Sequence, residues 1–270
     1  FRSSLSVFIS SRSLTRIFIN LYILYMTINL GLIGGGYWGK NLVREFNNLG
    51  VLHTICDNNL ESLEKYNPES KFIHFSTDYI FDGNFETPIK EEDIPNPLSK
   101  YGKSKLLGEK ILQESNIPSI IIRVSWLYSI FGTNFMKTII KLSQNKKIIN
   151  VIDDQVGSPT SANDLAKCVL KIINSDKFNY YAKKKEIFNF CNDGSCSWYE
   201  FAKEILKLTN SNCQVIRITT SEYNTLAKRP KYSVLNTSKI KSAFGLNINS
   251  WQEALQKTMI SANTNYNKSQ

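Results

Sequence analysis

The chain has few of the residues that build several common kinds of site. It contains only two histidines, His53 and His74, in 270 residues. A metal site made of several histidines is therefore excluded, and a Ser-His-Asp triad has no support. Its five cysteines are an odd number and form no CxxC pair, so we expect reduced thiols and a cytoplasmic protein. No apolar run reaches the roughly 20 residues that span a bilayer, so we expect no stable membrane insertion.

Composition places the chain among ordinary globular proteins. It is 42% hydrophobic and 21% charged, with a net charge of +10. The lysines are scattered rather than interleaved with aromatic residues, so a nucleic-acid partner is not expected. A basic surface instead suits ligands that carry phosphate.

The length of 270 residues suggests one domain, or a nucleotide-binding domain with a smaller lobe. The chain starts with Phe1, and its first methionine is Met26, so residues 1–25 are interpreted as a non-native or untranslated leader. A membrane-associating segment is the alternative for these residues. The further predicted divisions are a dinucleotide-binding segment (26–70), a catalytic part (71–170), a substrate-binding lobe (171–260) and a frayed polar tail (261–270).

Residues 27–57 have the pattern of a strand, a helix and a second strand. GGGYWG, which follows the first strand, matches GxGxxG, and Asp57 ends the second strand. Such glycines let the backbone approach a pyrophosphate at a helix N-terminus. An acidic residue at this distance bonds the adenosine ribose and repels a 2′-phosphate, which favours NADH over NADPH. The predicted cofactor-binding residues here are Gly34, Gly36, Tyr37, Trp38, Gly39 and Asp57.

A second pattern begins at an apolar strand that ends in Ser76, Thr77 and Asp78. The segment KYGKSKLLGEKIL follows after an acidic linker and is typical of a helix, on which Tyr101 and Lys105 share a face. An ammonium beside a phenol lowers the phenol's pKa from about 10, so that it can exchange a proton with a carbonyl or alcohol oxygen. The alternative is an exposed amphipathic turn without chemistry. The linker carries Glu86, Glu91, Glu92 and Asp93, and we expect it to be a solvated loop.

These segments, with RVSWLYSIFGTNFMKTII, VIDDQVGSPTSANDLAKCVLKII and RPKYSVLNTSKIKSAFGLNINSWQEAL, resemble the dTDP-4-dehydrorhamnose reductases from about residue 71 to 255. The resemblance implies an extended short-chain dehydrogenase that reduces a dTDP-linked 4-keto-6-deoxysugar with NADPH or NADH. It also implies a possible homodimer and, in some members, Mg²⁺, whose ligands the sequence does not identify. The implied catalytic residues are Tyr101, Lys105 and Thr77, with Ser76 also at the cofactor. The implied substrate-binding residues are Asp78, Trp126, Asn134, Gln155 and Arg229.

The N-terminal segment has a different resemblance. Residues 27–57 resemble the opening of the Gfo/Idh/MocA oxidoreductases, and residues 58–70 are too few for the strand and helices of an intact doubly wound half. We therefore expect an α/β, Rossmann-like parallel sheet, shortened by missing βα units, with a small C-terminal lobe. Two alternatives to the reductase stay open: a Gfo/Idh/MocA-type sugar dehydrogenase, and an inactive or regulatory nucleotide-binding relative.

Periodicity predicts the later elements. Strands are expected at 119–125, 148–152, 187–190 and 215–218, and helices at 136–142, 162–173, 198–208 and 251–259. Trp198, on one of these helices, is interpreted as a core residue.

Overall fold

The computed structural model describes residues 5–10, 29–33, 44–45, 52–56, 71–223 and 228–267. The predicted glycine motif at 34–39, Asp57 and the whole segment 58–70 lie outside these residues.

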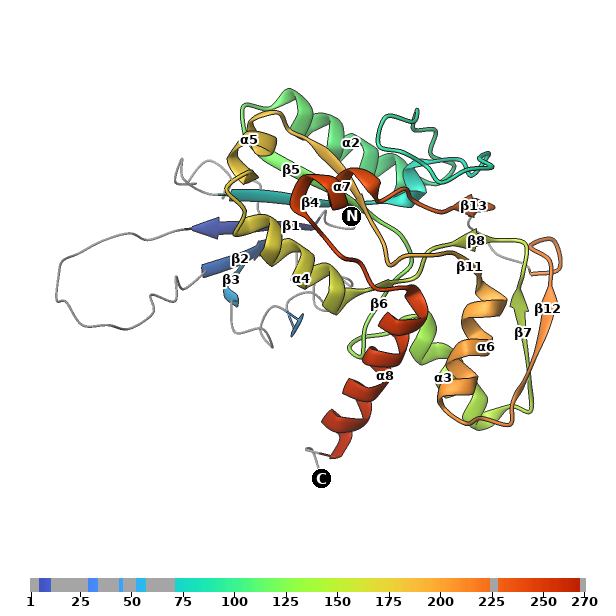
Figure 1. Ribbon diagram of the computed structural model, residues 1–270. Helices are drawn as coiled ribbons and strands as arrows, with labels where there is room; N and C mark the ends of the chain where they lie inside the picture. Colours follow the sequence, from blue (N-terminus) through green and yellow to red (C-terminus); the bar gives the residue numbers. More distant parts are fainter. Residues whose placement is uncertain are drawn as a thin grey trace.

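A six-stranded sheet forms the centre of the larger lobe (Figure 1). Its strands are, in spatial order, β10 (Ile187–Phe190), β5 (Ser119–Val124), β4 (Lys71–Thr77), β1 (Leu5–Ser10), β2 (Asn29–Ile33) and β3 (Leu52–Cys56). The pairs β10–β5, β5–β4 and β2–β3 are parallel, whereas β1 is antiparallel to both of its neighbours. The fold is thus the mixed α/β, Rossmann-like class that the sequence predicts.

The strand β1 occupies an unexpected place. It pairs with β4 on one side and β2 on the other, so that Val7 lies opposite both Ile73 and Leu32. In a doubly wound sheet with the strand order 3-2-1-4-5-6, the fourth strand separates the first strand from the fifth. Since two βα units are short or missing after β3, β1 takes the position of that fourth strand. Interpretation of residues 1–25 as a leader did not include this strand.

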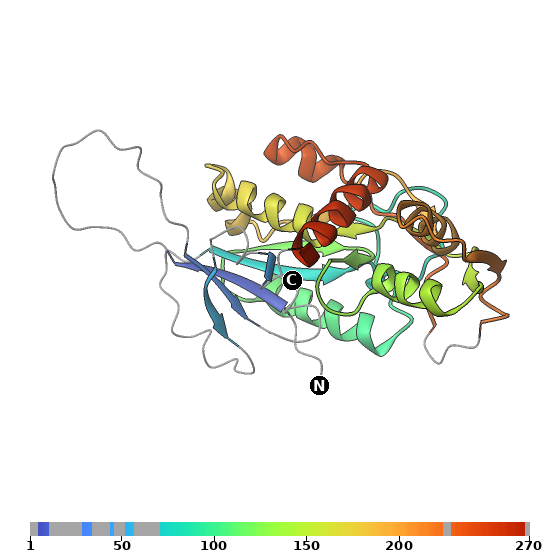
Figure 2. The ribbon, with the colours of Figure 1, turned by 90° about the horizontal axis from the view of Figure 1, so that it is seen from below.

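Helices cover both faces of the described sheet (Figures 1 and 2). On one face lies α2 (Lys100–Glu114), and on the other lie α4 (Ala162–Ile173) and α5 (Phe178–Lys183). Successive side chains of a strand point to opposite faces of the sheet, so each strand contributes to the core on both sides. Ile73 and Ile122 pack with α4, whereas Phe72 and Ile121 pack with Leu112 of α2. The helix α7 (Ser238–Phe244) closes the α4 side of the core.

The smaller lobe has its own core. It contains α3 (Phe135–Asn145), α6 (Trp198–Leu208), the first turns of α8 (Trp251–Asn267) and a parallel pair of β7 (Ile148–Ile152) with β12 (Gln214–Ile218). Phe201, Ile205 and Leu255 are fully or almost fully buried there. Short strands join the lobes: β6 (Leu127–Tyr128) with β9 (Thr160–Ser161), and β8 (Val156–Gly157) with β11 (Cys196–Ser197) and β13 (Tyr232–Ser233).

Most predicted elements are confirmed, and two expectations are corrected. The helix at 162–173 and the strands at 148–152 and 187–190 have the predicted bounds. The tail is not frayed from residue 261, because α8 continues to Asn267. The acidic linker is not solvated throughout, because Ile89 is fully buried and bridges to Leu235. The helices α5 and α7 and the two-residue strands were not predicted.

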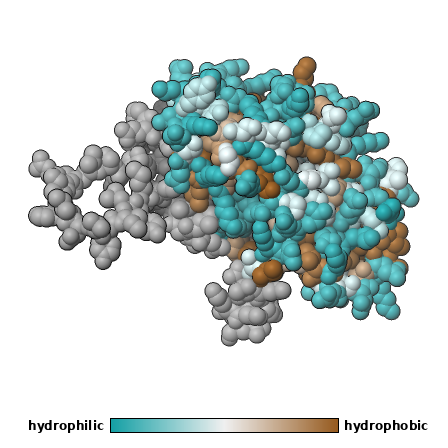
Figure 3. Space-filling view, viewed as in Figure 1, coloured by the Kyte–Doolittle hydropathy of each residue, from teal (hydrophilic) through white to brown (hydrophobic). Residues whose placement is uncertain are grey.

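The surface offers little apolar area on the face seen in Figure 3, where hydrophobic side chains of described residues form small patches among hydrophilic ones. Within the described ranges, no helix is both long and apolar enough to cross a membrane. The four cysteines whose side chains are described, Cys168, Cys191, Cys196 and Cys213, are all free thiols.

Candidate active site

The carboxyl end of β4 places three polar side chains together. Ser76, Thr77 and Asp78 are all nearly buried, at 3%, 6% and 2% exposure. Thr77 caps the short 3-10 helix η2 (Asp78–Ile80), since its Oγ1 accepts a hydrogen bond from the Tyr79 backbone N–H at 3.2 Å. The same hydroxyl donates to Asp78 Oδ1 at 3.0 Å. The turn therefore fixes the hydroxyl at the strand end.

Two atoms of this group have no hydrogen-bond partner in the described part of the chain, Ser76 Oγ and Asp78 Oδ2. Burial raises the pKa of Asp78 to about 7, although the hydroxyls of Thr77 and Ser233 oppose the shift. Buried polar atoms are rarely left without partners, so these two are candidates for contact with a bound ligand.

The first turn of α2 lies directly against η2. Ser99 caps the helix by accepting from the Gly102 N–H at 3.0 Å. A side chain at Gly102 would collide with the Tyr79 carbonyl group and come within 2.9 Å of Pro97. This close approach brings the Tyr101 ring edge-on against the Tyr79 ring, with centroids 6.1 Å apart. Tyr101 itself is 37% exposed.

Lys105 lies one turn further along α2 and points at the sheet. It is 8% exposed, and its Nζ donates to the carbonyl oxygen of Phe75, two residues before Thr77. Burial lowers the pKa of Lys105 to about 8, with the Glu109 carboxylate opposing the shift. At neutral pH the ammonium is therefore mostly charged.

The predicted catalytic trio thus lies at the end of β4, where Tyr79 connects Thr77 with Tyr101, and Lys105 binds the strand at Phe75. Its backbone bonds Thr77, its ring contacts Tyr101, and its carbonyl group meets the glycine beside Tyr101. Burial raises the pKa of Tyr79 to about 12, so its phenol stays neutral. Sequence reasoning did not identify this residue. Its position directly after Thr77 and Asp78, and its aromatic ring, were the signals that could have indicated contact with the site.

A buried ion pair supports α2 from behind. Arg123 of β5 donates to both carboxylate oxygens of Glu109, the shortest contact being 2.8 Å, and both side chains are 3% exposed. Arg123 also donates to the Glu91 carbonyl oxygen at 3.0 Å. The pair therefore fixes the helix that carries Lys105 to the sheet and to the linker.

Trp126, predicted to bind substrate, is half-buried between two neighbours. Its ring stacks on Trp198 with centroids 3.4 Å apart, and any side chain at Gly157 would overlap its indole. Its φ of 42° is in the left-handed region, which is costly for a large side chain. Trp198, predicted as core, is the partner in this stack. A role of Trp126 in substrate binding stays a prediction.

The other predicted substrate-binding residues differ in whether their side chains already form hydrogen bonds within the protein. Asn134 caps α3, and its amide donates to the Ser129 carbonyl oxygen at 2.6 Å. Gln155 is 2% exposed and donates to Thr220 Oγ1 at 3.0 Å. Arg229 is exposed, and its charge lowers the Tyr79 pKa, which places the guanidinium near the site. Their contacts with substrate stay predictions.

Two described residues of the N-terminal segment reach the catalytic part: Arg44, whose guanidinium lies 5.4 Å from the centre of the Phe131 ring, and Glu45. Glu45 is 4% exposed and accepts hydrogen bonds from Ser129 Oγ at 2.9 Å and Asn163 Nδ2 at 3.1 Å. The sequence gave no signal for this contact, because Glu45 lies among residues expected on the polar side of a helix.

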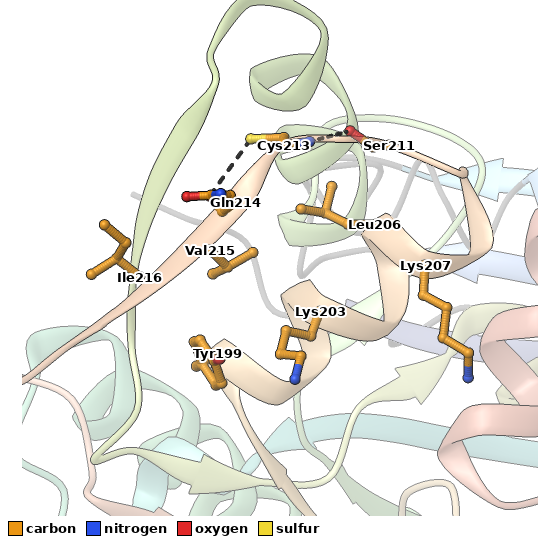
Figure 4. Close-up of a pocket in the computed structure, with 9 residues that line it drawn as sticks. All are labelled: Tyr199, Lys203, Leu206, Lys207, Ser211, Cys213, Gln214, Val215 and Ile216. Atoms are coloured by element: carbon orange, nitrogen blue, oxygen red, sulfur yellow. Dashed lines mark hydrogen bonds between the residues drawn. The ribbon is translucent and has the colours of Figure 1, made fainter.

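No group of three or more His, Cys, Asp or Glu residues within the described ranges is arranged to hold a metal ion. The expectation of Mg²⁺ therefore has no support among them. A surface cavity of about 380 Å³ lies between α6 and β12, where Tyr199, Lys203 and Cys213 line it (Figure 4). It contains none of the predicted site residues.

The fold and the Thr-Tyr-Lys arrangement define a Rossmann-like short-chain dehydrogenase. Residues 63–264 match the family described as RmlD substrate binding domain. The chain belongs to this family, that of the dTDP-4-dehydrorhamnose reductases. Since the match begins at residue 63, it leaves the resemblance of residues 27–57 to Gfo/Idh/MocA oxidoreductases a prediction.

Several relatives are similar over the same part. The spore coat polysaccharide biosynthesis protein SpsK of Bacillus subtilis (strain 168) is 37% identical over 211 residues, which cover 78% of this chain and 69% of SpsK. The dTDP-4-dehydrorhamnose reductase of Aggregatibacter actinomycetemcomitans is 41% identical over 197 residues, covering 69% of this chain and 65% of the relative.

A solved structure agrees with these matches. The dTDP-4-dehydrorhamnose reductase of Bacillus anthracis str. Ames, in complex with NADP, gives a TM-score of 0.65 at 36% identity. That comparison covers 70% of this chain and 65% of the other. The chain thus spans about two thirds of the length of the relatives it matches.

Proposed function

We propose that this chain reduces the C4 ketone of a dTDP-linked 4-keto-6-deoxysugar, converting dTDP-4-dehydrorhamnose to dTDP-L-rhamnose with NAD(P)H. The observation that carries this proposal is the gathering of Thr77, Tyr101 and Lys105 at the end of β4, where Tyr79 contacts the first two and Lys105 donates to the Phe75 carbonyl oxygen. Family membership supports the substrate class, because curated relatives bear the name of this reductase.

Each residue has a distinct role in the proposed reaction. Tyr101, which is 37% exposed and lies one helical turn before the buried Lys105, donates a proton to the C4 oxygen. Lys105 stabilises the phenolate that this transfer leaves. Thr77 donates a hydrogen bond to the same C4 oxygen and holds the ketone in line.

The groups at the carboxyl end of β4 would suit a nicotinamide cofactor. Ser76 Oγ is a buried hydroxyl without a partner in the described ranges, and the Lys105 ammonium lies close to it along β4. These two groups and Tyr101 would hold the nicotinamide ribose, and the reduced ring supplies the hydride. The residues 34–39 would hold the pyrophosphate. We infer a preference for NADH from Asp57, which comparison of the NADH and NADPH dissociation constants tests; tighter binding of NADPH would refute it.

The activity is tested with the whole chain and the 4-keto sugar nucleotide by following oxidation of NADH or NADPH. We expect Tyr101→Phe to lower kcat by about 10²–10⁴-fold, the usual contribution of a general acid, while ligand binding persists. Tyr180→Phe is the matched control, since this exposed tyrosine lies on α5 away from the site. Equal rates for the two variants would exclude Tyr101 as the acid.

An inactive or regulatory nucleotide-binding relative is the second candidate, favoured by the few residues, 58–70, that separate the glycine-motif segment from β4. It predicts binding of dTDP-L-rhamnose without turnover in the native chain. We also infer a homodimer and a cytoplasmic location; sedimentation velocity tests the first, and cell fractionation tests the second.

A further inference from the structure

The Thr77 hydroxyl has a single proton, and its two neighbours restrict where that proton can point. Thr77 Oγ1 accepts from the Tyr79 N–H and donates to Asp78 Oδ1. A hydroxyl that donates to a carboxylate cannot donate to a ketone at the same time. When Asp78 is ionised, the Thr77 proton is therefore held by the carboxylate and is not available to a ketone.

Asp78 is an unusual partner for this hydroxyl. Its side chain is 2% exposed, its Oδ2 has no hydrogen-bond partner in the described ranges, and no ion pair among the described residues includes it. A buried carboxylate without a cation is costly, and protonation removes that cost. The protonated carboxyl carries an O–H, which can donate to the remaining lone pair of Thr77 Oγ1.

We infer that the protonation state of Asp78 sets the direction of the Thr77 hydroxyl: an ionised Asp78 holds the Thr77 proton, and a protonated Asp78 releases it to the C4 oxygen of the substrate. Asp78 is thus a positioning residue for the reaction proposed above, on which the inference rests. The proton on Asp78 stays there through the reaction, so no extra proton donor or acceptor is needed.

The neighbours of Asp78 leave it as the group that titrates near neutrality. The groups that face it are Thr77 and Tyr79 of its own turn, Ser233 of β13, Cys191 after β10, and Arg229 and Tyr101 on the far side of Tyr79. Burial raises the pKa values of Tyr79 and Cys191 to about 12, so both stay neutral. Burial also raises the pKa of Asp78, to about 7. Lys105, with a pKa of about 8, is the next group to titrate.

The test is the pH profile of kcat/KM for the full chain and for Asp78→Asn, whose amide is neutral at all pH values. A group with a pKa near 7 changes its protonated fraction about tenfold between pH 6 and pH 8. We therefore expect kcat/KM of the native chain to fall about tenfold more over this interval than that of Asp78→Asn. Glu92→Gln, a change of an exposed linker carboxylate, is the control and should keep the native profile.

A second set of variants tests whether the effect of Asp78 depends on the Thr77 hydroxyl. In a Thr77→Val background, Asp78→Asn should no longer change the profile, whereas Thr77→Ser keeps the hydroxyl and should keep the native profile. Parallel profiles for the native chain and Asp78→Asn would overturn the inference. An effect of Asp78→Asn that persists in Thr77→Val would overturn it as well, because Asp78 would then act without Thr77.

Binding of dTDP-L-rhamnose provides a readout that does not need turnover. Its C4 hydroxyl oxygen can accept from Thr77, so its affinity should weaken between pH 6 and pH 8 in the native chain and change less in Asp78→Asn. If this difference in binding appears but no variant turns over substrate, the proposed reductase activity fails and the assignment of Asp78 stands. If turnover is present and the difference in binding is absent, the assignment of Asp78 fails.

Discussion

The buried pair of Arg123 and Glu109 allows a prediction with a calculable size. Removing one member of a buried ion pair leaves an unpaired charge and costs about 3–5 kcal/mol. Both side chains here are 3% exposed and joined at 2.8 Å, so Arg123→Met should fall within that range. With an m-value of about 2–3 kcal/mol per M for a chain of this size, the urea midpoint should fall by about 1–2.5 M.

The assay is urea unfolding followed by circular dichroism, with Arg123→Met, Glu109→Gln and the double variant compared. The double variant should recover part of the loss, because neither charge is then left alone. The exposed pair of Lys207 and Glu204 gives the control, and its removal should cost about 0–1 kcal/mol. A midpoint shift for Arg123→Met no larger than that of the control would refute the view that this pair anchors α2.

Two further predictions concern the packing around the site. Gly102→Ala should lower the melting temperature and the activity, because the added methyl group would collide with the Tyr79 carbonyl. Gly108→Ala on the same helix is the control. It should be neutral or stabilise the protein by up to about 1 kcal/mol, because its methyl group would meet only a side chain at 3.5 Å. Similar melting temperatures for the two variants would refute the close approach. Removal of residues 1–25 should lower the melting temperature and promote aggregation, because it deletes β1 and exposes the edges of β2 and β4; an unchanged melting temperature would show that β1 contributes no stability.

The elements that sequence reasoning located well are those whose signal is local. The helix α4 has a continuous apolar stripe and polar residues opposite, and its bounds were predicted correctly. The strand β5 reads as a buried apolar run, and every residue in it is buried. The tail of α8 was missed because its residues are polar. Adding turns to an anchored helix costs little, however, and Trp251 and Leu255 anchor this one in the core.

The elements that were missed depend on contacts distant in the chain. Ile89 is buried because Val234 and Asn236 bond its backbone from a segment far along the sequence. The strand β1 likewise acquires its place by pairing with β4 and β2, and no periodicity in residues 5–10 specifies those partners. In the site, the spacing of Tyr101 and Lys105 predicted a shared helix face, but the link through Tyr79 required the structure.

The chemistry of this site depends on a short stretch of chain. The contacts that join Thr77, Tyr79, Gly102 and Lys105 all arise between β4 and the first turns of α2, and none of them uses a residue before position 71. Loss of βα units elsewhere therefore does not remove the proton donor or the group that tunes it. The loss acts instead on the binding of the cofactor, whose pyrophosphate is expected at residues 34–39. A weakened enzyme of this kind should show a raised KM for NADH with a kcat that still depends on Tyr101. A regulatory relative would show no turnover at any NADH concentration, so saturation with cofactor separates the two candidates.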